Sequence, residues 1–372
     1  MKDPQKKRKH RAVRAMDAVT NAYPKAWISF ERLRKKRGTL GFRRWPDWCY
    51  VPIAAGDWLV SGAVDQNVPS KRLSHPAIIT AIGAWRMTKS LYRFNKTLMF
   101  DLFKTPIDRD LPCSHLLHLP EWCLYISLIE AGLQINQRAV YGAWVHLNYA
   151  YAIGFPGQAE FCMVIDCAKD PTEPFADNGL LCAPPLKMDG GSFADYFVSL
   201  QDVEQQQQSK KKKKGADRNR PQSMRDVLSC VLSLALYICA DPEFTRRGRP
   251  GRPSNPLPKV KKDVSFEPLP AKFPLVWDVG ESAGEALRRV YESKGAEAPG
   301  LPTNSEPRSD NQVGRCAHWY TFTSVSGASR EAAANIEAVR TQQLLWIPPI
   351  PAEPFSLKSL HPLEDERARM QR

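Results

Sequence analysis

The stretch Glu121-Trp-Cys-Leu-Tyr-Ile-Ser-Leu128 decides the fold, because apolar side chains alternate along it. Residues of one parity are Trp122, Leu124, Ile126 and Leu128, and those of the other are Cys123, Tyr125 and Ser127. A period of two is typical of a β-strand, in which successive side chains point to opposite faces. The pattern therefore predicts a strand here.

Two more extended runs follow, over residues 139–152 and 160–167. Turn residues separate the three runs: Gly132 and Asn136 in the first connection, and Gly154, Pro156 and Gly157 in the second. Short connections of this kind favour an antiparallel meander. Residues 318–325 and 343–347 predict two carboxy-terminal strands, which we expect in the same sheet.

Helical spacing and capping signals predict the other elements. We expect helices over residues 11–22, from Pro24 to Gly38, over 281–294, and in one long amphipathic region from Ser74 to Phe103. Ser192 and Ser223 each precede an aspartate by three residues, a helix-start signal, and Asp241-Pro242 stops the second of these helices. Residues 246–274 predict an irregular connector, rich in proline and basic side chains. The fold class is therefore α+β: an antiparallel sheet packed with helices.

The charge is unevenly distributed. The net charge is +14, yet residues 1–44 hold 15 Lys/Arg against 3 acidic residues, and residues 205–262 hold 15 against 4, so the remainder is acidic. Runs of like charge resist packing, which predicts a basic arm and a disordered loop. The predicted organisation is a basic helical arm (1–44), a helix-plus-meander core (45–204), a Gln/Lys-rich loop (205–222), a helical and β part of the same core (223–350) and a charged tail (351–372).

The two basic segments are attractive to phosphate backbones. They predict contact with RNA or the ribosome through lysines and arginines, although solvated tails without a specific partner are the alternative. The candidate contact residues are Lys6, Lys7, Arg8, Lys9, Arg11, Lys210, Lys211 and Lys212.

No apolar run approaches the roughly 20 residues that a membrane helix needs. The nearest, residues 227–240, predicts a buried helix, and the basic amino terminus is not followed by the apolar core of a secretory signal. We therefore expect a cytoplasmic protein.

The nine cysteines include no Cys-x-x-Cys pair. The densest cluster, Cys113, His115, His118 and Cys123, has residue types that zinc prefers. Its spacing is irregular and Pro120 interrupts it, so we expect no metal site and no cofactor.

No phosphate-binding glycine loop, nucleophile elbow or zinc-protease helix motif is present in the sequence. His318, next to Trp319 and Tyr320, could serve as a general acid–base group of a ribonuclease, with Arg315 or His146 as a second group. A structural role is the more ordinary use of a strand histidine among aromatics, and we assign no catalytic residue. The aromatic side chains could instead clamp a peptide.

Five blocks occur in an order that resembles one family: 82–86 (Ile-Gly-Ala-Trp-Arg), 119–123 (Leu-Pro-Glu-Trp-Cys), 234–243, 279–284 with Arg288-Arg289, and 317–319 (Ala-His-Trp). The chain is similar over about residues 75–350 to the type V-A anti-CRISPR proteins that block production of the effector nuclease. It departs from that family pattern where His-Trp-His is replaced by His318-Trp-Tyr320 and Tyr-Trp-x-Gly by Thr321-Phe-Thr-Ser324.

The resemblance implies a protein of a phage or plasmid that acts during synthesis of the effector. It implies recognition of the effector's nascent amino-terminal peptide, followed by translation-dependent loss of the messenger RNA. We therefore expect a binding protein and not an enzyme. The candidate partner-binding residues are the aromatic members of these blocks and strands: Trp85, Trp122, Trp144, Trp277, His318, Trp319, Tyr320 and Trp346. A ribonuclease and an RNA-binding regulator remain the alternatives.

Overall fold

A computed structural model describes residues 9–39, 42, 44–62, 74–108, 111–150, 157–176, 179–188, 191–209, 223–240, 269–293, 313–325 and 340–351. Its centre is a seven-stranded mixed sheet in the order β7-β6-β5-β2-β1-β9, with β8 also pairing with β6. These strands are β1 (Ser90–Phe94), β2 (Cys123–Ser127), β5 (Gly142–Ala150), β6 (Gln158–Asp166), β7 (Leu180–Cys182), β8 (Leu186–Lys187) and β9 (Leu275–Val279).

The predicted meander is confirmed: β2 pairs antiparallel with β5, and β5 with β6. The sheet is mixed, however, because β1 runs parallel to both β2 and β9. The alternation along β2 places Leu124 and Ile126 in one apolar cluster and Cys123 and Tyr125 in the other. Both faces of the sheet are therefore covered, as its apolar strands require.

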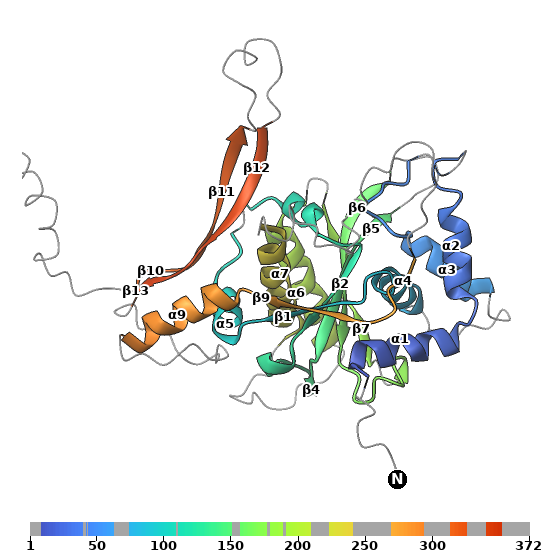
Figure 1. Cartoon of the computed structure of the whole chain (residues 1–372), viewed down its shortest axis with the longest axis horizontal. Helices are drawn as coiled ribbons and strands as arrows, with labels where there is room; N and C mark the ends of the chain where they lie inside the picture. Colours follow the sequence, from blue (N-terminus) through green and yellow to red (C-terminus); the bar gives the residue numbers. More distant parts are fainter. Residues whose placement is uncertain are drawn as a thin grey trace, which may run out of the picture.

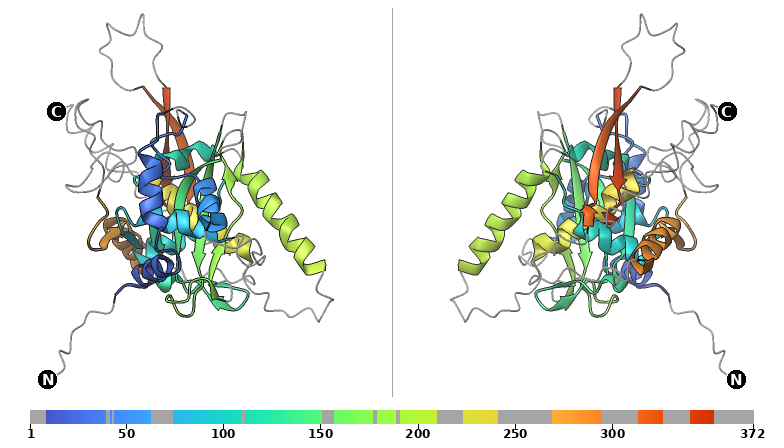
Figure 2. Two further views of the ribbon diagram at one scale, coloured as in Figure 1. Left: turned by 90° about the vertical axis from the view of Figure 1, so that its right-hand side faces the viewer. Right: turned by 90° about the vertical axis from the view of Figure 1, so that its left-hand side faces the viewer.

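Helices α1 (Arg11–Ala22), α2 (Ala26–Arg34), α3 (Ile53–Gly62) and α4 (His75–Trp85) contribute to the cluster on one face. Helices α5 (Lys96–Lys104), α6 (Phe193–Ser209), α7 (Met224–Ala240) and α9 (Glu281–Ser293) contribute to the other. Figure 1 shows α1–α3 to the right of the sheet and α5, α7 and α9 to its left. Figure 2 shows α6 diverging from the rest of the body along its length.

Short elements complete the described chain. They are the 3-10 helices η2 (Cys113–His118) and η3 (Ile129–Ala131) and the two-residue strands β3 (Gln134–Ile135) and β4 (Arg138–Ala139), which pair with each other. Among the described residues, no helix is both long and apolar enough to cross a membrane.

The long helical region predicted from Ser74 to Phe103 is wrong, because β1 divides it into α4 and α5. Lys89 has φ +50, a left-handed conformation that ends the helical path before the strand. Asn95 then starts α5, since its side-chain oxygen accepts hydrogen bonds from the N–H groups of Thr97 and Leu98. Four of the five β1 residues are buried, because both faces of this strand are covered. Apolar side chains on both faces do not alternate strictly, so they also fit the period of a helix.

The prediction that the carboxy-terminal strands join the main sheet is also wrong. β11 (His318–Val325) and β12 (Arg340–Ile347) form a separate antiparallel hairpin, which projects from the body in Figure 1. At its base β10 (Val313–Arg315) pairs with β13 (Ile350–Pro351). Strand β9 pairs with β1 at this edge of the main sheet. The sequence did not predict β9, because the segment before it is rich in proline.

Several helix boundaries are confirmed, including α1 over residues 11–22 and the end of α7 before Asp241-Pro242. The start signals at Ser192 and Ser223 are real caps, because each hydroxyl accepts from the N–H of the aspartate three residues on. The predicted start of the Gln/Lys-rich loop at residue 205 is too early, because α6 continues to Ser209. Residues 1–8, 210–222 and 352–372 lie outside the described residues, so the predictions for the arm, the lysine run and the tail stay predictions.

Candidate functional site

An apolar groove of about 440 Å³ lies between α7, α9 and β12. The helix α9 supplies one wall through a stripe at i, i+3, i+4 and i+7, and β12 with the two prolines after it supplies another. The lining residues are Tyr237, Ala240, Ala283, Ala286, Leu287, Val290, Leu345, Trp346, Pro348 and Pro349. The groove therefore joins segments separated by more than forty residues of sequence.

Helix α9 follows β9 through Gly280, whose φ of +68 suits glycine. A Cβ at Gly280 would lie 2.0 Å from Leu98 Cδ2, so the turn also needs the absence of a side chain. Gly284 is similarly restricted, because a Cβ there would overlap the Asn95 side chain. These two glycines seat α9 against α5 and fix the wall of the groove.

The hairpin holds its position through its inner face. Trp319 and Trp346 are directly opposite each other across β11 and β12, and both are buried, as is Leu344. The Trp346 ring contacts Tyr237 edge-on at 6.0 Å, and its Nε1 donates to Thr105 Oγ1 at 3.0 Å. Packing and a buried hydrogen bond therefore dock the base of the hairpin onto α7 and α5.

At the base of the hairpin, the opposite face is exposed. Tyr320 and Leu345 are paired across the strands, and their side chains are 53% and 46% exposed. Leu345 also borders the groove. An apolar pair beside an apolar groove forms a continuous surface that a partner could cover.

A short polar chain joins α9 to the hairpin through α5. Tyr291 donates from its hydroxyl to Asp101 Oδ1 at 2.8 Å, and Thr105 donates to the main-chain oxygen of Asp101 at 2.8 Å while accepting from Trp346. Burial raises the pKa of Asp101 to about 6, opposed by the Tyr291 hydrogen bond and the charge of Lys104. The two walls of the groove are thus tied to the same helix.

Comparison with known proteins identifies the family. A model of the AcrVA2-like family, described as the Anti-CRISPR type V subtype A2 family, matches residues 92–352. The chain belongs to this family. Membership confirms the resemblance found in the sequence and identifies an anti-CRISPR protein directed at type V-A systems.

Two relatives extend this comparison. Protein FinQ of Escherichia coli is 24% identical to this AcrVA2-like chain over 292 residues, which cover 75% of this chain and 77% of FinQ. The crystal structure of AcrVA2 is similar to the structure of this chain, with a TM-score of 0.60 and 16% sequence identity. The match covers 93% of this chain and 100% of the AcrVA2 chain. At 16% identity this similarity is evidence for the fold alone, and it supports an α+β fold.

Two of the five family-like blocks line the groove, and a third lies in the hairpin strand beside β12. Residues 234–243 supply Tyr237 and Ala240, residues 279–284 begin α9 with Ala283, and His318 and Trp319 lie in the strand paired with β12. The sequence named Trp346 and Trp319 but missed the alanine stripe of α9. The sequence does contain a pattern that predicts this stripe, since the spacing of Ala283, Ala286, Leu287 and Val290 places them on one helical face.

The other predicted partner-binding tryptophans lie in the core. Trp85, Trp144 and Trp277 are fully buried, and Trp122 is buried with its Nε1 donating to the Asp47 oxygen. Trp85 and Trp144 meet edge-on at 6.4 Å, whereas Trp277 stacks with Tyr92. Direct contact with a partner is incompatible with this burial, because their large apolar surfaces are already covered inside the sheet and helix layers.

The candidate catalytic residues are placed differently from what a two-histidine site needs. His146 is buried in β5 opposite Cys123 and Cys162, and burial lowers its pKa to about 4. His318 lies in the separate hairpin, where its Nδ1 is 3.2 Å from the Cys316 oxygen. Arg315 is in β10, but its side chain lies outside the described residues.

The cysteine–histidine cluster is split between η2, which carries Cys113, His115 and His118, and β2, which begins at Cys123. Burial raises the pKa of Cys113 to about 11 and lowers that of His115. Within the described ranges no three His, Cys, Asp or Glu side chains are grouped as metal ligands would be.

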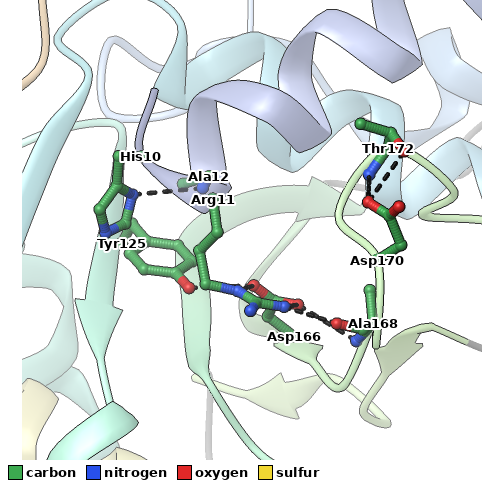
Figure 3. A network of polar contacts seen from close by, with 8 residues as sticks. All are labelled: His10, Arg11, Ala12, Tyr125, Asp166, Ala168, Asp170 and Thr172. Carbon is green, nitrogen blue, oxygen red and sulfur yellow. Dashed lines mark hydrogen bonds and ion pairs between the residues drawn. The ribbon is translucent and has the colours of Figure 1, made fainter. Parts of the chain in front are cut away.

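Arg11 has a structural role that the sequence did not reveal (Figure 3). Its guanidinium donates to both carboxylate oxygens of Asp166, at 2.6 and 2.9 Å, and to the Ala168 oxygen at 2.6 Å. Tyr125 also donates to Asp166, at 3.0 Å, and Arg11 lies 3.6 Å from the centre of the Tyr141 ring. This network pins α1 to the end of β6, so Arg11 is engaged within the chain rather than presented to RNA.

Of the other basic candidates, Lys9 lies within the described residues. Lys9 is exposed and pairs with Asp17 at 2.8 Å. Lys6, Lys7, Arg8, Lys210, Lys211 and Lys212 lie outside the described residues. A polar cleft of about 840 Å³ does lie next to α1, where Arg14, Arg138 and Lys169 are mixed with Asp170 and Glu173.

Proposed function

We propose that this protein lowers production of the type V-A effector nuclease by binding the effector's nascent amino-terminal polypeptide, and that loss of the messenger RNA follows during translation. The observation that carries the proposal is the apolar groove, which two of the family-like blocks line. Anti-CRISPR function itself comes from the family, whereas the nascent-peptide mechanism is our inference.

The groove has the chemistry of a peptide site. Its walls are almost entirely apolar, and Ala240, Ala283 and Ala286 are small enough for a bound main chain to approach closely. Tyr237, which is partly buried, adds an aromatic surface to the groove, and aromatic side chains dominate binding hot spots at a low entropy cost. A volume near 440 Å³ suits a few side chains of a peptide better than a folded domain.

Action during translation also requires proximity to a ribosome in the bacterial cytoplasm. The basic segments at residues 6–11 and 210–214 would supply a salt-sensitive attraction to its phosphate-rich surface. We propose that these segments raise the local concentration of the inhibitor, while the groove supplies the selectivity. Deleting residues 1–8 should therefore weaken repression without removing its dependence on the target peptide.

We further propose that the protein acts by binding and not as a nuclease. The burial of His146 and its placement in a different sheet from His318 support this choice. Purified protein incubated with naked effector RNA separates the alternatives: cleavage would support a ribonuclease, and salt-sensitive binding alone would support an RNA-binding regulator. We expect neither cleavage nor sequence-selective retention of the RNA.

Recoding the target gene tests the proposal in cells. Synonymous codons over the first stretch of the effector gene keep the peptide and should keep repression. A frameshift that preserves almost all nucleotides but changes the peptide should abolish it. Repression that follows the nucleotides rather than the amino acids would overturn nascent-peptide recognition.

A further inference from the structure

The exposed side of α2 carries a row of basic side chains outside the segments that the sequence singled out. Lys25, Arg32 and Lys36 are all exposed, and their intervals of seven and four residues place them on one helical face. The turn after α2 continues this path, because the Lys36 N–H donates to the Leu33 oxygen at 3.0 Å. These three residues form a basic stripe, which is about 16 Å long at a rise of about 1.5 Å per residue.

The acidic side chains next to the basic stripe in sequence are already paired with other cations. Glu31 accepts from Arg86 at 2.5 Å, and Asp47 pairs with Arg37. Between residues that the structure describes, no ion pair engages a member of the stripe. The charges of the stripe are therefore available to an anion from outside the chain.

The inner side of α2 is fixed in the core, so the basic stripe has a rigid support. Trp27 and Phe30 are buried against Gly83 of α4, where an added Cβ would lie 2.9 Å from both rings. Arg34 donates to the Tyr50 oxygen at 2.6 Å. Figure 1 shows α2 on the outer side of α4, away from the sheet. A partner that binds the stripe therefore orders little main chain, which lowers the entropy cost of binding.

The charge of this region indicates the class of partner. Residues 25–48 hold eight Lys/Arg against two acidic residues, whereas the chain outside residues 1–44 and 205–262 is acidic overall. A local excess of positive charge on an acidic body attracts a polyanion, and the phosphate backbone of RNA is a polyanion.

A membrane surface fits the stripe less well than RNA does. A helix that lies on a membrane buries a broad apolar face in the lipid. In α2, which the structure describes throughout, Trp27 and Phe30 are buried, Leu33 is partly buried and Ile28 is exposed. The apolar face of α2 is therefore used by the core, and the outer face is mainly basic.

We propose that the basic stripe of α2 contacts the phosphate backbone of ribosomal RNA, independently of base sequence. Each of its three cations neutralises a phosphate and releases a counterion, which makes the contact sensitive to salt. The choice of ribosomal RNA among polyanions rests on the proposed action during translation, whereas phosphate binding by the stripe does not. Because the stripe selects no message, the groove remains the surface that recognises the target.

Fluorescence anisotropy of the full chain with a labelled hairpin of ribosomal RNA tests the proposal, at salt concentrations from about 50 to about 200 mM. Lys25→Gln/Lys36→Gln removes two charges of the stripe, and Lys25 makes no side-chain cap bond whose loss would weaken α2. Lys96→Gln/Lys187→Gln is the matched control, because both lysines are exposed on α5 and β8. The stripe variant should reduce the steepness of log K against log salt by about 2, at about 0.9 per phosphate contact. The control variant should keep the slope of the parent, and all three proteins should share one melting temperature.

Lysine acetylation read by mass spectrometry gives a second readout on the parent protein. Ribosomal RNA should protect Lys25 and Lys36 from acetylation and leave Lys96 and Lys187 reactive. Both double variants should bind the effector peptide as the parent does, so a failure of the stripe is distinguishable from a failure of the groove.

Three results would overturn the proposal: an unchanged salt slope in the stripe variant, an equal change in the control, or equal protection of all four lysines. Binding to anionic phospholipid vesicles that depends on Lys25 and Lys36, when RNA binding does not, would also overturn it and would assign the stripe to a membrane surface.

Discussion

The central sheet and the carboxy-terminal hairpin use the same aromatic residue types for different purposes. In the sheet, Trp144 is covered on all sides and contacts Tyr125 at 4.7 Å. In the hairpin, Trp346 is buried on the docked face, whereas Tyr320 and Leu345 on the other face remain about half exposed. An aromatic-rich strand is therefore accessible to a partner only where one of its faces lacks a covering layer.

The largest change in stability that tests this comparison is expected for a substitution in the central sheet. Trp144→Ala should lower the free energy of unfolding by about 3–5 kcal/mol, because it leaves a cavity in a close-packed core. Trp58→Ala is the matched control, since Trp58 is 69% exposed on α3, and should change stability little. Urea unfolding measures both, and equal losses for the two variants would contradict the assigned packing.

Breaking the pair that fixes α1 should have the next largest effect on stability. Arg11→Gln leaves the carboxylate of Asp166, which is fully buried, without its cation, and should cost about 3 kcal/mol. Lys9→Gln removes a pair in which both side chains are largely exposed, so its effect should be small. Urea unfolding again measures both, and a stable Arg11→Gln variant with weakened RNA binding would restore the arm role expected from the sequence.

How much of this arrangement the sequence predicts depends on the range of the contacts. Helix α1 and the β2-β5-β6 meander follow from local periodicity and turn residues, and both were predicted. Strand β1 was taken as helix, because apolar side chains on both of its faces also fit a period of 3.6. Strand β9 was hidden behind a proline-rich segment, and its parallel pairing with β1 bridges more than 180 residues.

The groove was predicted only in part for the same reason. Trp346 was named from the sequence, but the side chains that face it come from α7 and α9 and are brought together by tertiary packing. Likewise, nothing near Arg11 in the sequence identifies Asp166 as its partner, which is 155 residues away. Burial, which separates the core tryptophans from the exposed Tyr320 and Leu345 of the hairpin, is a property of the packed layers.

The pH dependence of stability should expose a smaller effect in the sheet. Burial raises the pKa of Glu121 to about 8, and its Oε1 accepts a hydrogen bond from the Tyr92 hydroxyl at 3.0 Å. The folded state therefore keeps a proton that the unfolded chain releases near its ordinary pKa of about 4.3. Stability from this group is present below that value and is lost as the pH rises through about 8.

Asp101, whose pKa is raised to about 6 by burial, acts in the same direction over a lower range. The lowered pKa of buried His146 acts in the opposite direction below the ordinary histidine value of about 6.5, so the test uses the range above that value. Thermal melts from about pH 7 to about pH 9 should show falling stability, and Glu121→Gln should flatten the curve. A melting temperature that rises steadily across this range in the parent protein would contradict the assignment.

The smallest effect on stability is expected at the groove. Ala286→Arg places a long charged side chain on the exposed part of the α9 stripe, where it fills the groove without disturbing buried packing. Surface substitutions of this kind usually change stability by less than about 0.5 kcal/mol. Repression in cells should nevertheless be lost, whereas Glu285→Arg, one residue away on the same helix and outside the groove lining, should retain it.

Direct binding to the groove is the most decisive measurement. A fluorescently labelled peptide comprising the amino-terminal segment of the type V-A effector is titrated with the purified parent protein and with the Ala286→Arg and Glu285→Arg variants, all of equal melting temperature. Our account predicts saturable binding to the parent and to Glu285→Arg, and at least a tenfold weaker affinity, about 1.4 kcal/mol, for Ala286→Arg. Equal affinity of all three proteins for the peptide, or no binding by any of them, would contradict the assignment of the groove as the peptide site.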